Sequence, residues 1–583
     1  MPLTTPISCI SSIRFAALAT DYDGTLADQG FVDASTIDGL RRLRRSGRRA
    51  ILVTGRTLAS MRDVFPDLKE FDSIVAENGA TLYTPATNSE TMLAAPPPET
   101  FLHLLRQRAR TPFDVGRSIV ATSIDEKQIV LDVIHELGLE LHIIFNKGSL
   151  MVLPSGVNKA TGLAAAAKAL GISTHNMAGI GDAENDHAFL SACEFSAAVA
   201  NALPTLKERV QFVTGETHGR GVVQLIDGII ANDLADHACR LGRPLAIGHT
   251  AGGTEVTVPA CGNILLTGQS GGGKSTLTVS FLESLFSAGY QFCVIDAEGD
   301  YESFPDAVLL GNATHAPSVA EVLKALSPPT QNVVINLLGL ELEQRPSFFQ
   351  TLIARIEELR SSCGHPHCLI VDEAHHFISP DHAPPDLHLH EYADDPAAGL
   401  TLITVNPSSI PPETLARVRF LAIAGDEPFA ALQAFCAGTG VACPDISALR
   451  LQPGEMLGWR PGEGAPFAFS AAPSESVRVR HRRKYAEGQL APDRSFYFRG
   501  PQDKLNLRAP NLITFLNLMN GVDSETWLHH LRQGDYSTWF RKEIKDEDLA
   551  RQAAEIENEP GLSADESRQK MHALITERYT IPA

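Results

Sequence analysis

The sequence predicts an α/β protein in three parts: a Rossmann-like core with an inserted segment, a second α/β domain, and a small α-helical C-terminal domain. Short apolar runs end in polar, acidic or glycine-rich residues, as at Phe15–Ala19, Ala50–Val53 and Cys368–Val371. Helix-like segments separate these runs, and such alternation is typical of parallel sheets with helices on their faces. From Asn511 onwards, apolar residues recur at helical spacing instead, which predicts the third part.

The composition limits the classes of function. The chain has 583 residues, 44% of them hydrophobic and 20% charged, and a formal net charge of −20. This length suits roughly three or four domains. The acidic balance argues against a long basic groove for nucleic acid, although it leaves room for a local basic patch. Nine scattered cysteines indicate buried thiols in a reducing cytoplasm. No run approaches the ~20 apolar residues of a membrane span, so no membrane partner is expected.

The first apolar run leads into a pair of carboxylates. Phe15–Ala19 is followed closely by the pattern D-Y-D-G-T, which contains Asp21 and Asp23. Alternate residues of an extended chain point the same way, so both carboxylates can face one site at the end of the strand where ligands bind. One can attack an electrophile while the other moves a proton. Gly24 allows a sharp turn that brings backbone N–H groups close to an anion. The alternative for this motif alone is a solvated acidic turn.

Three later motifs extend this pattern. T-G-R follows Ala50–Val53, E-N-G-A follows Ser73–Ala76, and G-D-A-E-N-D follows Met177–Ile180. Before the last of these, P-S-G-V-N-K opens an alanine-rich helix. Each motif alone has a simpler explanation, such as a solvated Lys159 or acids that favour a helix start. Their order along the chain argues for a shared site.

These motifs, in this order, resemble the four motifs of the haloacid-dehalogenase (HAD) superfamily of phosphatases. The E-N-G-A and P-x-G-V-N-K patterns also resemble the Cof-type, or IIB, branch, which includes sugar-phosphate phosphatases. In that branch an α+β cap that selects the substrate is inserted into the core. The segment at about 81–151 interrupts the core pattern, with a proline-rich run and helix-like and strand-like pieces, and is identified as this cap.

The resemblance implies a role for each motif residue. Asp21 would be the nucleophile that forms an aspartyl-phosphate, and Asp23 the general acid and base. Thr54 and Lys159 would hold the phosphoryl oxygens as part of the catalytic set. The implied phosphate- or substrate-binding residues are Thr54, Gly55, Asn78, Lys159 and Asn185. The implied Mg²⁺ ligands are Asp21, Asp23 (through its backbone carbonyl), Asp182 and Asp186. Metal and lysine would together stabilise the charge on the transferring phosphoryl group.

A nucleotide-binding motif follows the buried run Asn263–Thr267. The pattern G-x-x-x-x-G-K-S is a P-loop, whose glycines let successive N–H groups wrap phosphates at the start of a helix. Lys274 would reach the β- and γ-phosphates, and Ser275 would bind Mg²⁺. The predicted ATP-binding residues are Gly268, Gly271, Gly272, Gly273, Lys274, Ser275 and Thr276. A plain glycine-rich linker is not favoured, because a strand precedes the motif and a helix follows it.

The run Cys368–Val371 ends in Asp372 and Glu373, which predicts a Walker B segment. Asp372 would hold Mg²⁺ through water, and Glu373 would polarise the attacking water as a catalytic residue. The glutamate favours a hydrolytic NTPase over a small-molecule kinase. Just before this strand, Cys363–Cys368 offers two cysteines and two histidines. These lie too close together for the usual zinc geometry, and no zinc site is predicted.

The segment I-D-A-E-G-D-Y, residues 295–301, resembles the D-P-E-G-D-Y stretch of HerA/FtsK-like ATPases, the superfamily of DNA pumps and related motors. Members usually carry Thr-Gln-Arg-Pro after a later strand, whereas this chain has V-N-P-S at 405–408. The altered sensor position and the acidic charge argue against DNA translocation. A regulatory or switch ATPase is preferred.

The sequence therefore predicts a bifunctional cytoplasmic hydrolase that uses Mg²⁺ and ATP. A phosphatase for a phosphorylated sugar or similar small metabolite (13–235) is joined to a P-loop ATPase (240–475) and a helical domain without chemistry of its own (476–583). ATP would regulate or assemble the phosphatase, and a homo-oligomer fits the ATPase resemblance. Two alternatives stay open: a nucleic-acid-directed motor with an accessory phosphatase, and a scaffold that only binds ligands. The basic run Arg478–Lys484 fits a nucleic-acid contact or an internal acidic partner.

Overall fold

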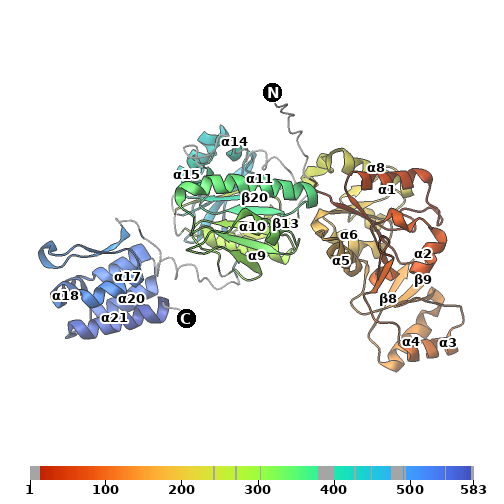
Figure 1. The fold of residues 1–583 in the computed structure, drawn as a ribbon, viewed down its shortest axis with the longest axis horizontal. Coiled ribbons are helices and arrows are strands. Elements are labelled where there is room, and N and C mark those ends of the chain that lie inside the picture. The colour runs from red at the N-terminus through yellow and green to blue at the C-terminus, as the bar shows by residue number, and fades with distance from the viewer. Residues whose placement is uncertain are drawn as a thin grey trace. The chain divides into compact units, whose positions relative to one another are not determined.

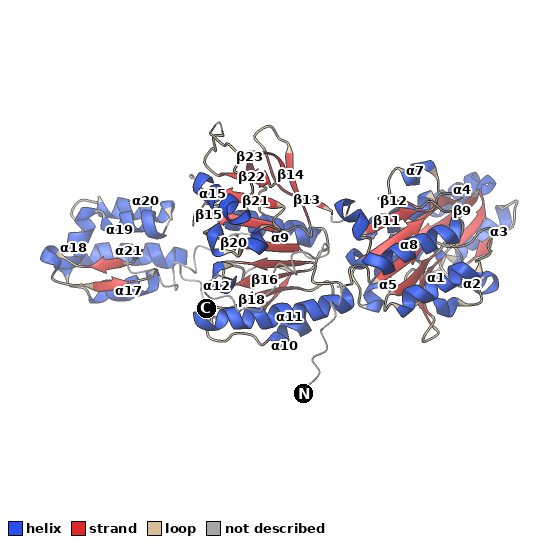
Figure 2. Ribbon diagram, turned by 90° about the horizontal axis from the view of Figure 1, so that it is seen from above, coloured by secondary structure: helices blue, strands red, loops and turns tan. Residues whose placement is uncertain are grey.

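The computed structural model describes residues 13–579 except 147, 241–242, 270–271, 303, 379–398, 426–427, 448, 475–489, 491–493 and 545. Gly271 and the basic run Arg478–Lys484 therefore lie outside the described residues. The chain forms two compact units. The first ends at residue 474 and lacks 298–305, and the second holds 298–305 together with the chain after 474. Helices flank the strands of each large sheet (Figures 1 and 2). No described helix is long and apolar enough to cross a membrane.

The first sheet has the strand order β12-β11-β10-β1-β2-β3-β4-β5. Its strands are β1 Ala17–Thr20, β2 Arg49–Val53, β3 Ser73–Ala76, β4 Thr81–Thr84, β5 Ser89–Met92, β10 Met177–Gly181, β11 Phe195–Ala198 and β12 Phe212–Val213. The strands from β12 to β3 are parallel, and β4 and β5 add an antiparallel edge. Strands β1, β2, β3, β10 and β11 are buried except for Arg49, which explains their continuous apolar runs.

Helices cover both faces of this sheet. They are α1 Ala34–Arg45, α2 Leu58–Val64, α5 Lys159–Leu170, α6 His187–Ala192, α7 Pro204–Lys207 and α8 His218–Asn232. From β1 the chain adds β2 and β3 on one side, and later adds β10, β11 and β12 on the other. Because such crossovers are right-handed, the helices of the two halves lie on opposite faces. Helices α5 and α6 pack on each other, whereas α8, which follows the last strand β12, packs on α1 of the first half (Figure 1).

A smaller antiparallel sheet, in the order β6-β7-β9-β8, forms the inserted layer. Its elements are β6 Asp114–Val115, β7 Val120–Ser123, β8 Leu141–Asn146 and β9 Ser149–Pro154, with helices α3 Glu99–Arg108 and α4 Lys127–Leu137. One face packs on the helices around a core that includes Phe101, Val130 and Val152. Strands β4 and β5, which fall within the range predicted for the cap, instead extend the first sheet.

The P-loop lies in an eleven-stranded sheet with the order β14-β13-β23-β22-β21-β15-β20-β19-β16-β18-β17. The strands are β13 Pro244–His249, β14 Glu255–Pro259, β15 Ile264–Gly268, β16 Phe292–Asp296, β17 Ala307–Leu310, β18 Asn332–Asn336, β19 Cys368–Val371, β20 Gly399–Thr404, β21 Phe420–Ala424, β22 Glu455–Arg460 and β23 Glu463–Ala471. The helices are α9 Lys274–Ser287, α10 Val319–Leu326, α11 Arg345–Cys363, α12 His375–Ile378, α14 Pro412–Leu415 and α15 Pro428–Thr439. Strand β20 separates the P-loop strand β15 from the Walker B strand β19.

The second unit is mainly helical, with one short hairpin. Its elements are β24 Phe496–Phe498, β25 Leu507–Ala509, α17 Leu512–Gly521, α18 Ser524–Gln533, α19 Asp535–Trp539, α20 Glu547–Glu557 and α21 Ala564–Tyr579. Its core is aromatic: Trp527 stacks on Tyr536 with ring centroids 4.5 Å apart, and Trp539 stacks on Phe515. These tryptophans are core residues of this unit.

Candidate active sites

The parallel register of the first sheet brings its motif residues to one edge. Thr20 of β1 pairs with Ile180 of β10, and the backbone N–H of Asp21 donates to the Ile180 carbonyl oxygen at 3.1 Å. Asp21 and Asp182 therefore follow neighbouring strands at the same level. Thr54 follows β2, which pairs with β1 on the other side. The carboxyl ends of these three strands are where an open α/β sheet binds ligands.

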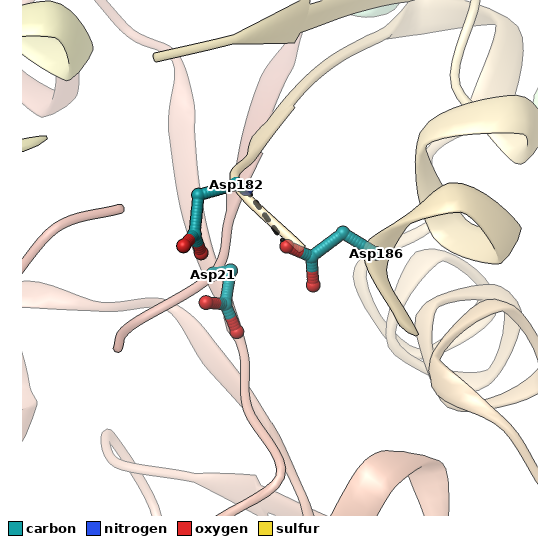
Figure 3. A group of neighbouring side chains, drawn as sticks. All are labelled: Asp21, Asp182 and Asp186. Carbon is teal, nitrogen blue, oxygen red and sulfur yellow. Dashed lines mark hydrogen bonds between the residues drawn. The ribbon is translucent and has the colours of Figure 1, made fainter. Parts of the chain in front are cut away.

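Three carboxylates meet at this edge (Figure 3), together with one ammonium group. Carboxylate oxygens of Asp21, Asp182 and Asp186 all lie within 4.8 Å of one another. Lys159, the first residue of α5, donates from Nζ to Asp21 Oδ1 at 2.5 Å and to Asp186 Oδ1 at 2.6 Å. Asn158 caps this helix by accepting from the N–H groups of Ala160 and Thr161. Each of the four charged side chains is buried.

The cluster holds three carboxylates and one ammonium group, all buried, and the pKa of one carboxyl group is raised. Burial, and then the nearby Asp186 carboxylate, raise the pKa of Asp21 to about 8 despite the lowering effect of Lys159. Burial lowers the pKa of Lys159, but attraction to Asp186 and Asp21 outweighs this and raises it above its ordinary value. A divalent cation would supply the missing positive charge. Clustered carboxylate oxygens are the hard ligands that Mg²⁺ prefers, so the residues present fit this ion.

Within the cluster Asp186 has a different environment from the other two carboxylates. Its Oδ2 accepts from the backbone N–H groups of Asp182 (Figure 3) and Ala183, both at 2.9 Å, and its Oδ1 accepts from Lys159. Asp182 in turn accepts from the Thr25 hydroxyl at 3.0 Å. Asp186 thus orients Asp182 and Lys159, while Asp21 and Asp182 carry the oxygens best placed for a direct metal bond. A ligand role for Asp186 stays a prediction.

Asp23 is held by Arg56, an arginine for which the sequence motifs predict no role. Arg56 donates from Nε to Asp23 Oδ2 and from a terminal nitrogen to Oδ1, both at 2.7 Å. Such a bidentate pair fixes the plane as well as the position of the carboxylate. The Asp23 side chain remains 38% exposed, so it can still meet a substrate. The signal was present in the sequence, because Arg56 is the third residue of T-G-R.

Thr54 and Asn78 line the other side of the strand edge. Thr54 is fully buried, and its hydroxyl oxygen accepts from the Arg56 N–H at 3.1 Å. Asn78 has a left-handed backbone with φ of 51°, and its N–H donates to the Thr54 carbonyl oxygen. Its buried Oδ1 has no hydrogen-bond partner within the described residues. An unsatisfied buried oxygen is costly and suits a ligand that donates a hydrogen bond. Asn185, half-exposed beside Asp186, borders the same edge.

The neighbouring Glu77 ties the inserted layer to the core. Its carboxylate accepts from the backbone N–H groups of Arg117, Ser118 and Ile119 at 3.0, 2.9 and 3.3 Å. The Asn78 amide also donates to Met151 Sδ of β9 at 2.8 Å. The E-N-G-A motif therefore contacts the inserted sheet directly, which the sequence alone did not indicate.

The P-loop follows β15 and leads into α9. A Cβ atom on Gly268, which has a φ of 123°, would lie 1.9 Å from the Ala424 carbonyl oxygen, so only glycine fits there. Lys274 donates from Nζ to the carbonyl oxygens of Gly268 and Gln269 at 2.6 and 3.1 Å. Gly272, Gly273, Ser275 and Thr276 are half-buried around the start of the helix. The helix N-terminus and the glycine backbone together form an anion-binding geometry.

The Walker B residues follow β19, two strands from the P-loop strand. Asp372 is buried, and Glu373 has a left-handed backbone with φ of 48°. Glu373 Oε2 lies 3.4 Å from His375 Nδ1, and the same nitrogen lies 3.4 Å from the hydroxyl of Thr404, the last residue of β20. Thr404 is therefore the residue at the end of β20 that contacts His375, while Val405, which replaces the family's sensor glutamine, is 43% exposed.

Comparisons with known proteins match both α/β domains. A family model for haloacid dehalogenase-like hydrolases matches residues 18–107 and 101–226, and an AAA domain model matches 259–405. The chain is 28% identical to the phosphoglycolate phosphatase of Methanothermobacter thermautotrophicus over 225 residues, 36% of this chain and 96% of that protein. It is 27% identical to phosphoglycolate phosphatase 2 of Saccharolobus solfataricus, over 37% of this chain and 93% of that protein.

A solved haloacid dehalogenase-like hydrolase from Bacteroides thetaiotaomicron is 18% identical and matches with a TM-score of 0.33, over 37% of this chain and 99% of that one. The chain carries an N-terminal HAD-superfamily phosphatase domain followed by an AAA-type domain, and is a hydrolase with phosphatase- and ATPase-type parts. The predicted fold class is confirmed. The matching model is described as an AAA domain, so the HerA/FtsK-like assignment stays a prediction.

Proposed function

We propose that the first domain is a Mg²⁺-dependent phosphatase for a small phosphorylated metabolite, and that the second binds and hydrolyses ATP to regulate it. The observation that carries the first half is the buried cluster of Asp21, Asp182, Asp186 and Lys159. Its excess negative charge calls for a cation, and its lysine suits a phosphoryl oxygen. Because two relatives are named phosphoglycolate phosphatases, 2-phosphoglycolate is our first candidate substrate, and sugar phosphates are the next.

The proposed reaction uses the two carboxylates of the first motif in turn. Asp21 attacks phosphorus and forms an aspartyl-phosphate, while Asp23 donates a proton to the departing alkoxide. Asp23 then takes a proton from water as the water attacks the phosphoryl group, which releases phosphate and regenerates Asp21. Thr54 and Lys159 hold the phosphoryl oxygens, and the bond from Arg56 keeps Asp23 aimed at the leaving group. A bound Mg²⁺ would add electrostatic stabilisation of the phosphoryl charge.

For the second domain we propose that Lys274 and the P-loop backbone bind the ATP phosphates and that Ser275 and Asp372 serve Mg²⁺. Glu373 would orient the attacking water. Its contact with His375, and the contact of His375 with Thr404, support a catalytic glutamate whose position depends on the end of β20.

The test is phosphate release from a panel of phosphoglycolate, sugar phosphates and nucleotides with Mg²⁺. Hydrolysis of one ester that Asp21→Asn abolishes and Lys274→Ala leaves intact would support the phosphatase. Hydrolysis of ATP that only Lys274→Ala abolishes would support the ATPase. If no ester is hydrolysed, or if Asp21→Asn keeps full turnover, the proposed phosphatase reaction is wrong.

A further inference from the structure

A buried polar joint connects the phosphatase domain to the AAA-type domain within the first unit. This interdomain joint consists of Arg14, His175, Asn176 and Glu194 on the phosphatase side, and Ala288, Tyr290, Gln291, Gly364 and His367 on the other. The side chains of Arg14, His175, Asn176, Glu194, Tyr290, Gln291 and His367 are all at most 5% exposed. None of them belongs to the catalytic motifs, so catalysis does not explain why these polar groups are buried together.

His175 makes one half of the joint. Its Nδ1 lies 2.9 Å from Glu194 Oε2, and its Nε2 lies 2.8 Å from the Ala288 carbonyl oxygen of the other domain. Because an acceptor faces each ring nitrogen, His175 makes both bonds only with a proton on each. The ring stacks on Tyr290 with centroids 3.7 Å apart, and the Tyr290 hydroxyl donates to the same Glu194 oxygen at 2.7 Å.

Asn176 and His367 make the other half. The Asn176 amide nitrogen donates to the carbonyl oxygens of Arg14 and Gly364, at 3.1 and 3.0 Å. His367 Nδ1 accepts from the Gln291 N–H at 2.9 Å, so its Nε2 carries the proton and donates to Asn176 Oδ1 at 3.2 Å. Burial and nearby His175 lower the pKa of His367 well below its usual range, which agrees with this neutral form. The donors of His175, Asn176, Tyr290 and His367 each meet an acceptor in this arrangement of the two domains.

Such a joint is not required for adhesion alone. Well-packed apolar side chains stabilise an interface at least as well as buried charges, whereas a fully matched polar set fixes a single arrangement. A shift of a few tenths of an ångström on one side lengthens several of these bonds together. A displacement of one domain is therefore passed to the other more directly through this joint than through an apolar interface.

Four joint residues also lie at or near the start or end of an element that reaches an active site. His175 and Asn176 precede β10, which ends at Asp182, and Arg14 lies close before β1, which leads to Asp21. Ala288 caps α9, which begins at Lys274 of the P-loop. This 14-residue helix is about 21 Å long. The two sites thus lie at the far ends of both sheets from the joint, so they do not share a substrate directly.

We propose that the interdomain joint couples the two sites, so that nucleotide at the P-loop changes ligand binding and turnover at Asp21 through α9, His175 and β10. This inference rests on the proposed function and specifies its regulation. Coupling between two binding sites is reciprocal, so occupation of the phosphatase site must change nucleotide affinity by the same factor.

The test uses the full chain with Mg²⁺, a non-hydrolysable ATP analogue, and orthovanadate as a mimic of the transferring phosphoryl group. The dissociation constant of the analogue is measured with and without orthovanadate, and the dissociation constant of orthovanadate is measured with and without the analogue. We expect each ligand to change the affinity of the other at least about fivefold, the lower end of typical allosteric coupling. The coupling ratio is the dissociation constant of one ligand without the other ligand divided by its value with that ligand. A ratio of one in both directions overturns the proposal, whether or not a phosphate ester substrate has been found. Because this readout needs no turnover, it separates failure of the coupling from failure of the proposed reaction.

Two variants locate the coupling. His175→Phe keeps the stacking on Tyr290 but loses both hydrogen bonds, and should bring the ratio close to one while each ligand still binds alone. Tyr290→Phe removes one hydroxyl, is the milder change if the first variant does not fold, and should at least halve the ratio. The matched control is Tyr83→Phe, which removes a hydroxyl bonded to Asn88 within β4 and its turn. Undiminished coupling in folded Tyr290→Phe, or an equal loss in Tyr83→Phe, would overturn the role of the joint.

Discussion

Lys159 Nζ lies 2.5 Å from Oδ1 of Asp21, and both side chains are buried at the carboxyl edge of the first sheet. The pair joins a residue of the first motif to one that lies 138 positions later. Burial, and then the nearby Asp186 carboxylate, raise the pKa of Asp21 to about 8 despite the lowering effect of this lysine. Without a cation, ionisation of Asp21 in this cluster should therefore lower the stability of the folded protein.

Asp21→Asn should abolish phosphatase turnover, by about 10³-fold or more, and stabilise the metal-free protein at high pH. The Asp21 pKa in the folded state, about 8, exceeds its ordinary value of 3.8. Its contribution to stability is therefore full below pH 3.8 and is lost as the pH rises through 8. In EDTA the melting temperature of the wild type should fall below that of the variant by about 5 °C between pH 6 and 9.

Mg²⁺ should reverse this difference. The ion stabilises the wild type more at pH 8 than at pH 6, because its binding displaces the proton from Asp21. The variant should gain little at either pH. Equal melting curves for the two proteins across this range in EDTA would show that Asp21 does not carry the excess charge.

Arg56→Ala should lower kcat about 10- to 100-fold with a smaller effect on KM, because Asp23 loses its bidentate partner and its fixed orientation. Arg56→Lys should restore little, since an ammonium group cannot form the paired bonds. The control is the double variant Arg56→Ala with Asp23→Asn, which is compared with Asp23→Asn alone. If Arg56 acts only through Asp23, its loss adds almost nothing in that background. Additive losses would mean that Arg56 contacts the substrate itself.

Much of this arrangement follows from the sequence because its motifs are local. Asp21, Thr54 and Asp182 each follow a continuous apolar run, and such runs become the buried parallel strands β1, β2 and β10. Parallel strands end at a common edge, so the cluster could be predicted without knowing any distance. The P-loop and Walker B residues were predictable in the same way, and the family comparisons confirm both domain types.

What the sequence did not reveal depends on pairs far apart in the chain. Asn176 and His367 are 191 positions apart, and neither lies in a motif that binds a ligand. The histidines of Cys363–Cys368 were considered as metal ligands, but His367 instead forms hydrogen bonds with Gln291 and Asn176 in the interdomain joint. Glu77 was noted only as part of E-N-G-A, because the backbone N–H groups that it binds carry no side-chain signature. Partner choice across domains is set by tertiary packing, which a periodic pattern does not encode.

Glu77→Ala should loosen the inserted layer. The change leaves the N–H groups of Arg117, Ser118 and Ile119 without their acceptor, at a cost of about 1–3 kcal/mol where they stay buried. We expect kcat/KM for the natural ester to fall about tenfold or more, and proteolysis within 95–118 to accelerate. Glu77→Gln, which keeps one acceptor oxygen, should be intermediate. Unchanged proteolysis and kcat/KM in Glu77→Ala would show that other contacts hold this layer.

Gly268→Ala should abolish nucleotide binding without affecting the phosphatase fold. The added Cβ would lie 1.9 Å from the Ala424 carbonyl oxygen, at a φ of 123° that alanine rarely adopts. The matched control is Gly252→Ala, whose Cβ would meet nothing closer than 3.8 Å and should change stability by less than about 0.5 kcal/mol. Binding is measured by titration with the non-hydrolysable analogue. Wild-type affinity in Gly268→Ala would show that the P-loop adopts a different backbone when nucleotide is bound.

Acid should destabilise the first unit through His365, which lies beside the joint. Its Nδ1 donates to Gln291 Oε1 at 2.7 Å, while its buried Nε2 has no partner within the described part of the chain. Burial, and then nearby Arg360, lower the pKa of His365 from 6.5 to about 4. Stability from this group is therefore complete above pH 6.5 and is lost as the pH falls towards 4, which amounts to about 2 kcal/mol at pH 5.

Urea unfolding of the wild type between pH 7.5 and 5 should show this loss, and His365→Phe should flatten the curve because it removes the titrating group. His135→Phe is the control, since His135 is an exposed residue of α4 on the inserted layer. Its curve should follow the wild type. If His365→Phe keeps the full acid dependence, the destabilising protons bind elsewhere, and His367 is the next residue to replace, because its pKa is lowered in the same direction by burial.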